Sequence, residues 1–291
     1  GRATFVDRAD IERQQLQPAS TWAPDQNAGG LLETFVEGVQ QRLLADVPVG
    51  IVLSGGLDSS LVAAVAHEAA ERAEQDVPEC WTVAESEENP DWVAAEHVAA
   101  HHDLVHHQHL LDADAFEKRL PDLAWHGEDA DVTVMFFHPL FEHMSNHVKV
   151  GLCGQGADEL HAGYPRYGDL EGHRAVLNQR MAALPEFHRQ ALTQGGLAAD
   201  EGWYQPRHDP ATPTADLQSM LNFELEHGQL SNFQLRLVDR HSMAHSLEVR
   251  VPFLGRAHRK AAYTLPAEWK RSPEREEKAA LRRAADLTNL P

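Results

Sequence analysis

The chain has 291 residues, of which 42% are hydrophobic and 24% are charged, and this composition excludes a wholly disordered chain or a low-complexity array. Its apolar runs are far shorter than the roughly 20 residues that cross a bilayer, and its N-terminal residues lack the apolar centre of a signal peptide, so we expect a soluble, cytoplasmic protein. Acidic residues outnumber basic ones by 45 to 25, and the net charge of −20 disfavours binding to nucleic acids or anionic membranes, because each phosphate contact needs a cation.

The first half of the chain alternates between short apolar runs and helical segments. Residues 1–30 are polar and irregular, with several prolines and glycines, and are predicted to be a lead-in segment. Apolar residues at helical spacing then predict a helix over residues 31–45. Strands are predicted at residues 49–53, 80–84, 103–111 and 147–153, and helices between them at residues 57–74, 92–101, 116–125 and 132–146. This alternation indicates an α/β fold with a parallel sheet and helices on both of its faces.

The pattern changes after about residue 169. Helices are predicted at residues 176–192, 217–243 and 278–285, and no strand is predicted in this half. The sequence therefore predicts three parts, which are a lead-in at residues 1–30, an α/β domain at residues 31–170 and a helical region at residues 171–291 that packs on the sheet domain.

The charges suggest a particular environment. Acidic residues are spread along the chain, and only five residues are lysines, namely Lys118, Lys149, Lys260, Lys270 and Lys278. An acidic surface that is poor in lysine suits a cytoplasm of high salt, where counterions screen the repulsion between like charges. We therefore expect a halophilic source.

Cysteine and histidine give little sign of cross-links or metal. Cys80 and Cys153 are far apart in sequence and are predicted to be free, buried thiols. Five histidines crowd into residues 101–109, but zinc spacings with paired cysteines and the HExxH pattern are absent from the chain. A solvated helix end and loop is therefore the favoured interpretation of this segment.

The most informative stretch is SGGLDSS at residues 54–60, directly after a predicted buried strand. Gly55 and Gly56 permit a sharp turn that brings backbone N–H groups close to a ligand, and the following helix points its positive end at the same place. Hydroxyl donors are added by Ser54, Ser59 and Ser60. These features predict a cradle for phosphate groups. Asp58 would repel phosphate there unless a divalent cation bridges the two, so Asp58 is predicted to be a magnesium ligand.

This loop has neither the lysine of a Walker A motif nor the GxGxxG pattern. It resembles the pyrophosphate loop of the ATP pyrophosphatases, which cleave ATP between the α and β phosphates. Three further stretches follow in order, GQGADEL at residues 154–160, DRHSMAHSLEVRVPFL at residues 239–254 and EKAALR at residues 277–282. Together with DVPVG at residues 46–50, they resemble the synthetase domain of asparagine synthetases over about residues 30–285.

The resemblance implies a Rossmann-like sheet of the ATP pyrophosphatase type and a reaction in two steps. A carboxylate, which is aspartate in the family, attacks the α-phosphorus of ATP to give an acyl-adenylate and pyrophosphate. Ammonia then attacks the activated carbonyl to give the amide, here asparagine, and AMP. Backbone groups of Leu53 and Val83 are implied to hold the adenine.

Two further roles follow from the strand order and the resemblance. Loops that follow parallel strands share one crevice, so Gly154 is predicted to face the nucleotide and Asp158 to share magnesium with Asp58. Lys278 matches the catalytic lysine of the family, which is implied to neutralise the pyrophosphate. The structural alternative for Lys278 is a helix-surface residue paired with a neighbouring glutamate.

The resemblance is imperfect at Gln155, where the family normally has a catalytic glutamate. Glutamine keeps the size and the hydrogen-bonding capacity of glutamate but cannot act as a base. Three interpretations stay open: an asparagine synthetase that is differently tuned, a related ligase for another carboxylate or amine, and a nucleotide-binding relative without turnover.

The source of nitrogen also stays open. Glutamine-dependent members of the family carry an N-terminal glutaminase domain with a cysteine as its first residue, whereas this chain begins with Gly1 and its first cysteine is Cys80. The resemblance therefore implies free ammonia, a glutaminase partner subunit, or a glutaminase domain in a longer protein. A homodimer is a further partner hypothesis.

Overall fold

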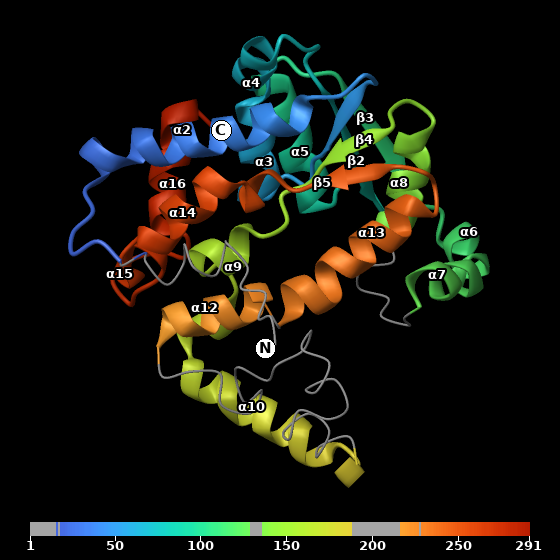
Figure 1. The fold of residues 1–291 in the computed structure, drawn as a ribbon. Coiled ribbons are helices and arrows are strands. Elements are labelled where there is room, and N and C mark those ends of the chain that lie inside the picture. Colours follow the sequence, from blue (N-terminus) through green and yellow to red (C-terminus); the bar gives the residue numbers. More distant parts are fainter. Residues whose placement is uncertain (1–15, 17, 129–135, 188–215, 227) are drawn as a thin grey trace, which may run out of the picture.

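The computed structural model describes residues 16, 18–128, 136–187, 216–226 and 228–291, and its centre is a parallel sheet (Figure 1). The five strands lie in the order β3-β2-β1-β4-β5, and every neighbouring pair is parallel. Their bounds are β1 (Val49–Val52), β2 (Glu79–Ala84), β3 (His106–Leu110), β4 (Val150–Leu152) and β5 (Glu248–Arg250). The predicted α/β class with a parallel sheet is therefore confirmed.

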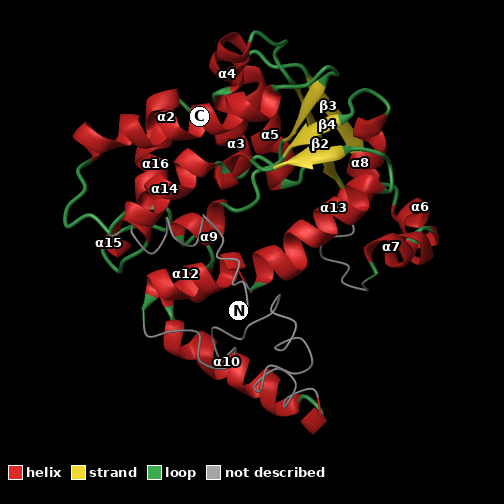
Figure 2. Cartoon of the chain, viewed as in Figure 1, coloured by secondary structure: helices red, strands yellow, loops and turns green. Residues whose placement is uncertain are grey.

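Helices cover both faces of the sheet, and each face has its own core (Figure 2). On one side lie α2 (Pro24–Leu43), α3 (Leu57–Ala64), α4 (Ala66–Ala73) and α5 (Pro90–His101), and on the other side lie α8 (Phe137–Ser145) and α13 (Leu235–Met243). Successive side chains of a strand point to opposite faces, so Ile51 belongs to the first core and Val52 to the second. β1 reads as an unbroken apolar run because both of its faces are buried.

The second core is built around Trp81, which is fully buried on β2. A Cβ atom at Gly50 would collide with the Trp81 ring, so glycine on β1 makes room for this large side chain. Cys80 and Cys153 are both buried and free, as predicted.

The rest of the described chain is mainly helical. The remaining α-helices are α6 (Ala113–Lys118), α7 (Leu120–Gly127), α9 (Ala157–His161), α10 (Leu170–Ala183), α12 (Leu217–Glu226), α14 (Arg256–Thr264), α15 (Ala267–Lys270) and α16 (Ala279–Ala285). Shorter turns are η2 (Pro165–Gly168), the π-helical η4 (Leu230–Gln234), η5 (Pro252–Leu254) and η6 (Asp286–Thr288). α16 lies against α2, so the end of the chain returns to its first described helix (Figure 1). Within the described ranges, every helix is too short or too polar for a bilayer span.

One strand lies where only helices were predicted. β5 pairs with β4 in the register Val150↔Glu248, so the prediction that no strand follows residue 169 is wrong. β5 has three residues, two of them charged, and therefore lacks the apolar run that marks a buried strand. Its pairing depends on β4, which lies far away in the sequence, and local patterning carries no such information.

Several predicted helices begin, end or break at other residues in the structure. α2 begins at Pro24, inside the predicted lead-in, because proline fits the first helical turn. The predicted helix at residues 57–74 is two helices that meet at Val65, and the one at residues 116–125 is two helices that meet at Arg119. Parts of the predicted segments at residues 1–30, 132–146 and 176–192 lie outside the described residues. The division at residues 31–170 and 171–291 stays a prediction.

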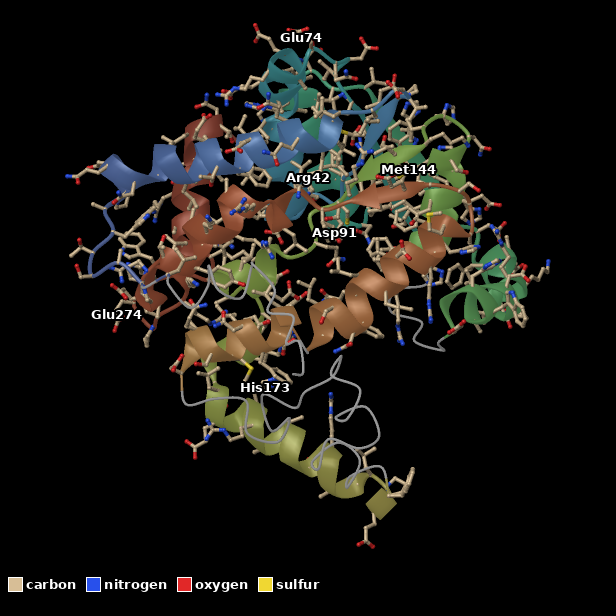
Figure 3. All side chains as sticks on the ribbon, in the orientation of Figure 1. Arg42, Glu74, Asp91, Met144, His173 and Glu274 are labelled. Atoms are coloured by element: carbon tan, nitrogen blue, oxygen red, sulfur yellow. The ribbon has the colours of Figure 1, made fainter. Side chains whose placement is uncertain are left out.

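Acidic side chains such as Glu74 and Glu274 lie at the edges of the molecule (Figure 3). With a net charge of −20, repulsion between such groups opposes folding in dilute buffer, and salt screens it. We expect the midpoint of thermal unfolding to rise by about 5 °C or more between about 0.1 M and about 2 M potassium chloride. Circular dichroism during heating measures this, and equal midpoints in the two buffers would contradict a halophilic protein.

Candidate active site

The SGGLDSS loop connects the end of β1 to the start of α3. Gly55 has a φ of +76°, and a Cβ atom there would lie 2.6 Å from the Asp91 carbonyl oxygen, so the turn requires glycine. The Ser54 N–H donates to the Ser59 hydroxyl at 3.0 Å, and the two serine hydroxyls lie 2.9 Å apart. The loop is therefore held in shape by its own side chains, with the N-terminus of α3 behind it.

A second loop closes on the first one. It follows β4 and contains Gly154, where a Cβ atom would lie 3.0 Å from the Ser59 nitrogen. Because no side chain stands between them, the loops after β1 and β4 touch directly, as expected for neighbouring parallel strands. Gly156, with a φ of +94°, then turns the chain into α9, and this short helix carries Asp158.

Between these loops lies a cavity of about 320 Å³. Most of the residues predicted from the sequence line it, namely Leu53, Ser54, Asp58, Ser59, Val83, Gly154, Gln155 and Asp158. Leu53 already uses its N–H for the Trp81 carbonyl, and its own carbonyl accepts a hydrogen bond from the Thr82 hydroxyl. A carbonyl oxygen has two lone pairs, so this one keeps acceptor capacity for a ligand.

Ser60 and Gly55 do not face this cavity. Both line a separate cavity of about 550 Å³ on the other side of the loop, beside Leu57 and Arg282. The Ser60 hydroxyl is buried and has no hydrogen-bond partner among the described residues. Neighbouring residues of a helix point about 100° apart, so Ser59 and Ser60 cannot both face the same cradle.

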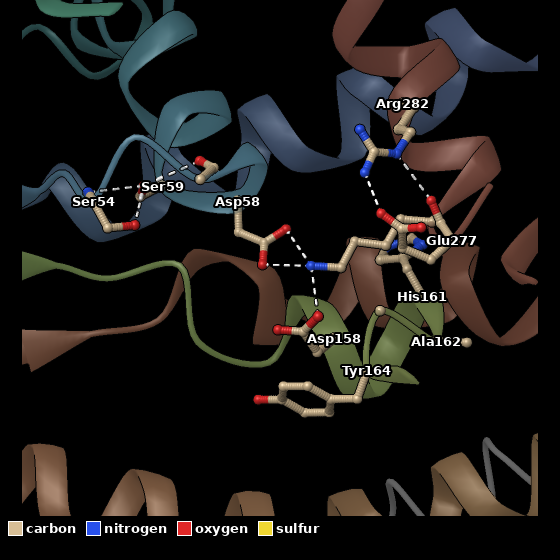
Figure 4. A network of polar contacts seen from close by, with 12 residues as sticks. Ser54, Asp58, Ser59, Asp158, His161, Ala162, Tyr164, Glu277 and Arg282 are labelled. Atoms are coloured by element: carbon tan, nitrogen blue, oxygen red, sulfur yellow. Dashed lines mark hydrogen bonds and ion pairs between the residues drawn. The ribbon is translucent and has the colours of Figure 1, made fainter. Parts of the chain in front are cut away.

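Lys278 joins the two loops. Its Nζ lies 2.8 and 2.6 Å from the two carboxylate oxygens of Asp58 and 2.7 Å from Oδ1 of Asp158 (Figure 4). Lys278 is only 7% exposed, so it is not the helix-surface residue of the structural alternative. A Cβ atom at Gly163 would collide with both Asp158 and the Lys278 side chain, so glycine there leaves room for the lysine stem.

The backbone of Lys278 is fixed in an unusual conformation. Its φ of +57° and ψ of +30° are left-handed, at the N-cap of α16. The Lys278 N–H donates to the Lys270 carbonyl at 2.8 Å, which anchors this turn. A non-glycine residue is strained in this region, and such strain gathers at functional sites.

Burial and charge oppose each other in this cluster. Burial, together with the charge of Asp158, raises the pKa of Asp58 to about 6 against the attraction of Lys278. Burial acts to lower the pKa of Lys278, but the carboxylates of Asp58 and Asp158 outweigh it and the pKa of Lys278 is raised. The ammonium is therefore charged at neutral pH and balances one of the two carboxylates.

The residues present fit a magnesium ion. Asp58 and Asp158 are oxygen ligands of the kind that Mg²⁺ prefers, and both reach one common point, which the Lys278 ammonium marks as favourable for a cation. Asp58 and Asp158 are only two ligands, and no group of three or more histidine, cysteine or acidic side chains converges as metal ligands in the described part of the chain. Two protein carboxylates suit Mg²⁺ that is also bound by substrate phosphates.

Several residues that line the cavity had no role in the site predicted from the sequence, among them Tyr164, Phe137 and Asp91. Tyr164 lies just after the GQGADEL stretch, and its hydroxyl accepts a hydrogen bond from Gln234 at 2.6 Å. Phe137, at the start of α8, adds an apolar wall, and only contacts between distant segments could have indicated it. Asp91 lies beyond the end of β2, and this position at the carboxyl edge of the sheet was the signal available.

Comparison with known proteins agrees with the geometry. The sequence profile of the family described as asparagine synthase matches residues 30–291. A probable glutamine-hydrolyzing asparagine synthetase of Schizosaccharomyces pombe is 28% identical, over 89% of this chain and 42% of that protein. A glutamine-hydrolyzing asparagine synthetase of Arabidopsis thaliana is 31% identical, over 88% of this chain and 39% of that protein. The chain thus spans less than half the length of these relatives. The family profile covers most of its residues and its parallel sheet is of the ATP pyrophosphatase type, so the chain belongs to the asparagine synthase family.

Proposed function

We propose that this chain binds ATP with magnesium in the 320 Å³ cavity and uses it to convert a carboxylate, expected to be aspartate, into an amide. One observation carries the proposal: two loops of the expected motifs touch, and Asp58, Asp158 and Lys278 meet where they do so. At a triphosphate, the two carboxylates would hold magnesium and the ammonium would neutralise phosphate charge. These groups come together from three segments that are distant in the sequence, and this supports a nucleotide site.

The proposed reaction begins with the nucleotide phosphates against the loop of Ser54 and Ser59, with the adenine towards Leu53 and Val83. An oxygen of the substrate carboxylate attacks the α-phosphorus, the bond from that phosphorus to the bridging oxygen breaks, and pyrophosphate leaves. Magnesium, when bound by Asp58 and Asp158, would supply positive charge to the phosphates. The loop N–H groups and hydroxyls stabilise the same charge without reorganisation.

The second step forms the amide. Ammonia attacks the carbonyl of the acyl-adenylate, AMP leaves with the electrons of the carbon–oxygen bond, and the nitrogen loses a proton. Gln155 lines the cavity and can hold the nucleophile by hydrogen bonds, but its amide cannot take that proton. The relatives are named glutamine-hydrolyzing, and we propose that ammonia reaches this chain either free or from a glutaminase domain or subunit.

Gln155 also supports a second candidate, a ligase of the same family type for another carboxylate or amine. An amine that loses its proton to another group would need less help from this position. Product identity separates the two candidates, because both release pyrophosphate.

The decisive assay measures pyrophosphate release in high salt with ATP, magnesium and aspartate, with and without ammonium. We expect release that depends on aspartate, and asparagine when ammonium is present. ATP binding with no release in the presence of aspartate would point to another substrate or to a relative without turnover. In that case Gln155→Glu is the next protein to test.

A further inference from the structure

The ammonium of Lys278 has no free hydrogen-bond donor. A protonated lysine has three N–H groups, and here Nζ lies within 2.8 Å of three carboxylate oxygens, two on Asp58 and one on Asp158. Figure 4 shows Asp58 and Asp158 turned towards this one nitrogen from separate elements. In this arrangement Lys278 cannot donate to a phosphate until it gives up at least one of these contacts.

The same position is the one a divalent cation needs. Asp58 and Asp158 would hold magnesium with the very oxygens that now surround the ammonium, and two cations cannot share this space because they repel each other. In the structure, the ammonium of Lys278 occupies the position between the two carboxylates that a divalent cation would take.

We propose that Lys278 is a resident cation that keeps divalent metal off Asp58 and Asp158 until nucleotide arrives, and that the ammonium moves to the phosphates when metal and nucleotide enter together. This inference rests on the proposed function, because it needs a nucleotide in the cavity. Its consequence is strong mutual dependence of metal and nucleotide binding, and such coupling is reciprocal by thermodynamic necessity.

The surroundings of Lys278 allow its side chain to move while its backbone stays in place. The N–H bond to the Lys270 carbonyl and the N-cap position on α16 fix the backbone, and the Arg282 side chain donates to the Glu277 carbonyl just before it. Gly163 leaves the space that the lysine stem occupies. Rotation about the side-chain bonds alone can therefore carry the ammonium from the carboxylates towards the cavity.

Manganese(II) is a suitable probe of the exchange, because free Mn²⁺ is counted by its paramagnetic resonance signal. We expect the unchanged protein without nucleotide to bind Mn²⁺ weakly, because the ammonium of Lys278 occupies the position between the two carboxylates. Lys278→Met removes the resident cation, and we expect Mn²⁺ affinity without nucleotide to rise about tenfold or more. In the unchanged protein, an ATP analogue with a methylene bridge between the α and β phosphates should produce tight Mn²⁺ binding.

Two controls locate the site. Lys149→Met removes an exposed lysine whose Nζ donates to the Ser145 carbonyl, and it should bind Mn²⁺ like the unchanged protein. Lys278→Met combined with Asp158→Asn should lose the gained affinity, because one of the two carboxylates is gone. Equal Mn²⁺ affinity in the unchanged protein and Lys278→Met, with analogue binding intact, would overturn the proposal.

A second measurement needs no variant. The chain has only five lysines, so labelling lysine side-chain nitrogen gives a simple magnetic resonance spectrum, in which we expect the buried Lys278 ammonium to exchange its protons slowly. Its signal should shift when Mg²⁺ and the analogue are added together, and stay in place with Mg²⁺ alone. An unmoved signal in the ternary complex would refute the exchange, whereas absence of analogue binding in every protein would instead refute the proposed function.

Discussion

Replacing Lys278 by methionine is expected to lower the rate of pyrophosphate release by about a thousandfold or more, while ATP affinity falls by less than about tenfold. The ammonium is the cation that lies between the loops after β1 and β4, and the charge of the leaving pyrophosphate develops only during reaction. Methionine keeps the length of the stem beside Gly163 and removes the charge. Release assays and titration with the methylene analogue measure the two effects separately.

Lys278→Arg tests whether any cation is enough. The planar guanidinium is wider than an ammonium and cannot direct three donors at Asp58 and Asp158 from the same position, so we expect activity as low as that of Lys278→Met. Lys149→Met is the matched control and should retain full activity, because that lysine is exposed. If Lys278→Met keeps its rate within about tenfold, the cation that neutralises pyrophosphate is another group.

The fold was predictable where one local pattern decides the structure. The strand at residues 49–52 is apolar on both faces and is soon followed by Gly55 and Gly56, and this combination is typical of a buried strand that leads into a turn. β5 could not be predicted in this way, because its residues Glu248 and Arg250 belong to the sheet only through their pairing with β4. The break at Val65 was hidden for a different reason: alanine-rich residues on both sides continue the helical pattern.

The sequence indicated which loops form the candidate site, but not how the side chains of those loops are arranged. The rule that loops after parallel strands share a crevice places Asp158 beside Asp58, and the structure brings the two together through Lys278. The rule does not say which way each side chain of a loop points, and Ser60 lies on the far side of the cradle. The position of Lys278 depends on its left-handed backbone conformation and on the hydrogen bond from its N–H to the Lys270 carbonyl. Neither feature leaves a pattern in the sequence.

Lys270 provides the second large effect, on stability. Its side chain is 1% exposed, its Nζ donates to Gln218 Oε1 at 2.5 Å, and burial lowers its pKa from 10.5 to about 7. A buried ammonium with one hydrogen-bond partner among the described residues opposes folding, so Lys270→Met should raise the free energy of unfolding at neutral pH by about 1 to 4 kcal/mol. Urea unfolding in high salt measures the difference.

The pH dependence of the free energy of unfolding tests whether the buried charge of Lys270 causes this effect. In the unfolded chain Lys270 keeps its proton up to a pKa of 10.5, whereas in the folded protein it loses the proton above about 7. Between these values the unfolded state binds one more proton, so this residue makes the free energy of unfolding rise with pH, by up to about 1.4 kcal/mol per pH unit. Methionine has no proton to release, so the advantage of Lys270→Met should be largest below about pH 7 and shrink as the pH rises towards 10.5.

The effects of replacing Lys270 and Lys278 can be measured separately, because the hydrogen bond between these two residues joins backbone atoms. The Lys278 N–H uses the carbonyl of Lys270, which methionine retains, so Lys270→Met should keep ATP binding while it changes stability. Lys149→Met, on the surface, should change neither the stability nor its pH dependence. A variant Lys270→Met that is less stable than the unchanged protein at every pH would mean that the hydrogen bond to Gln218 outweighs the burial of the charge.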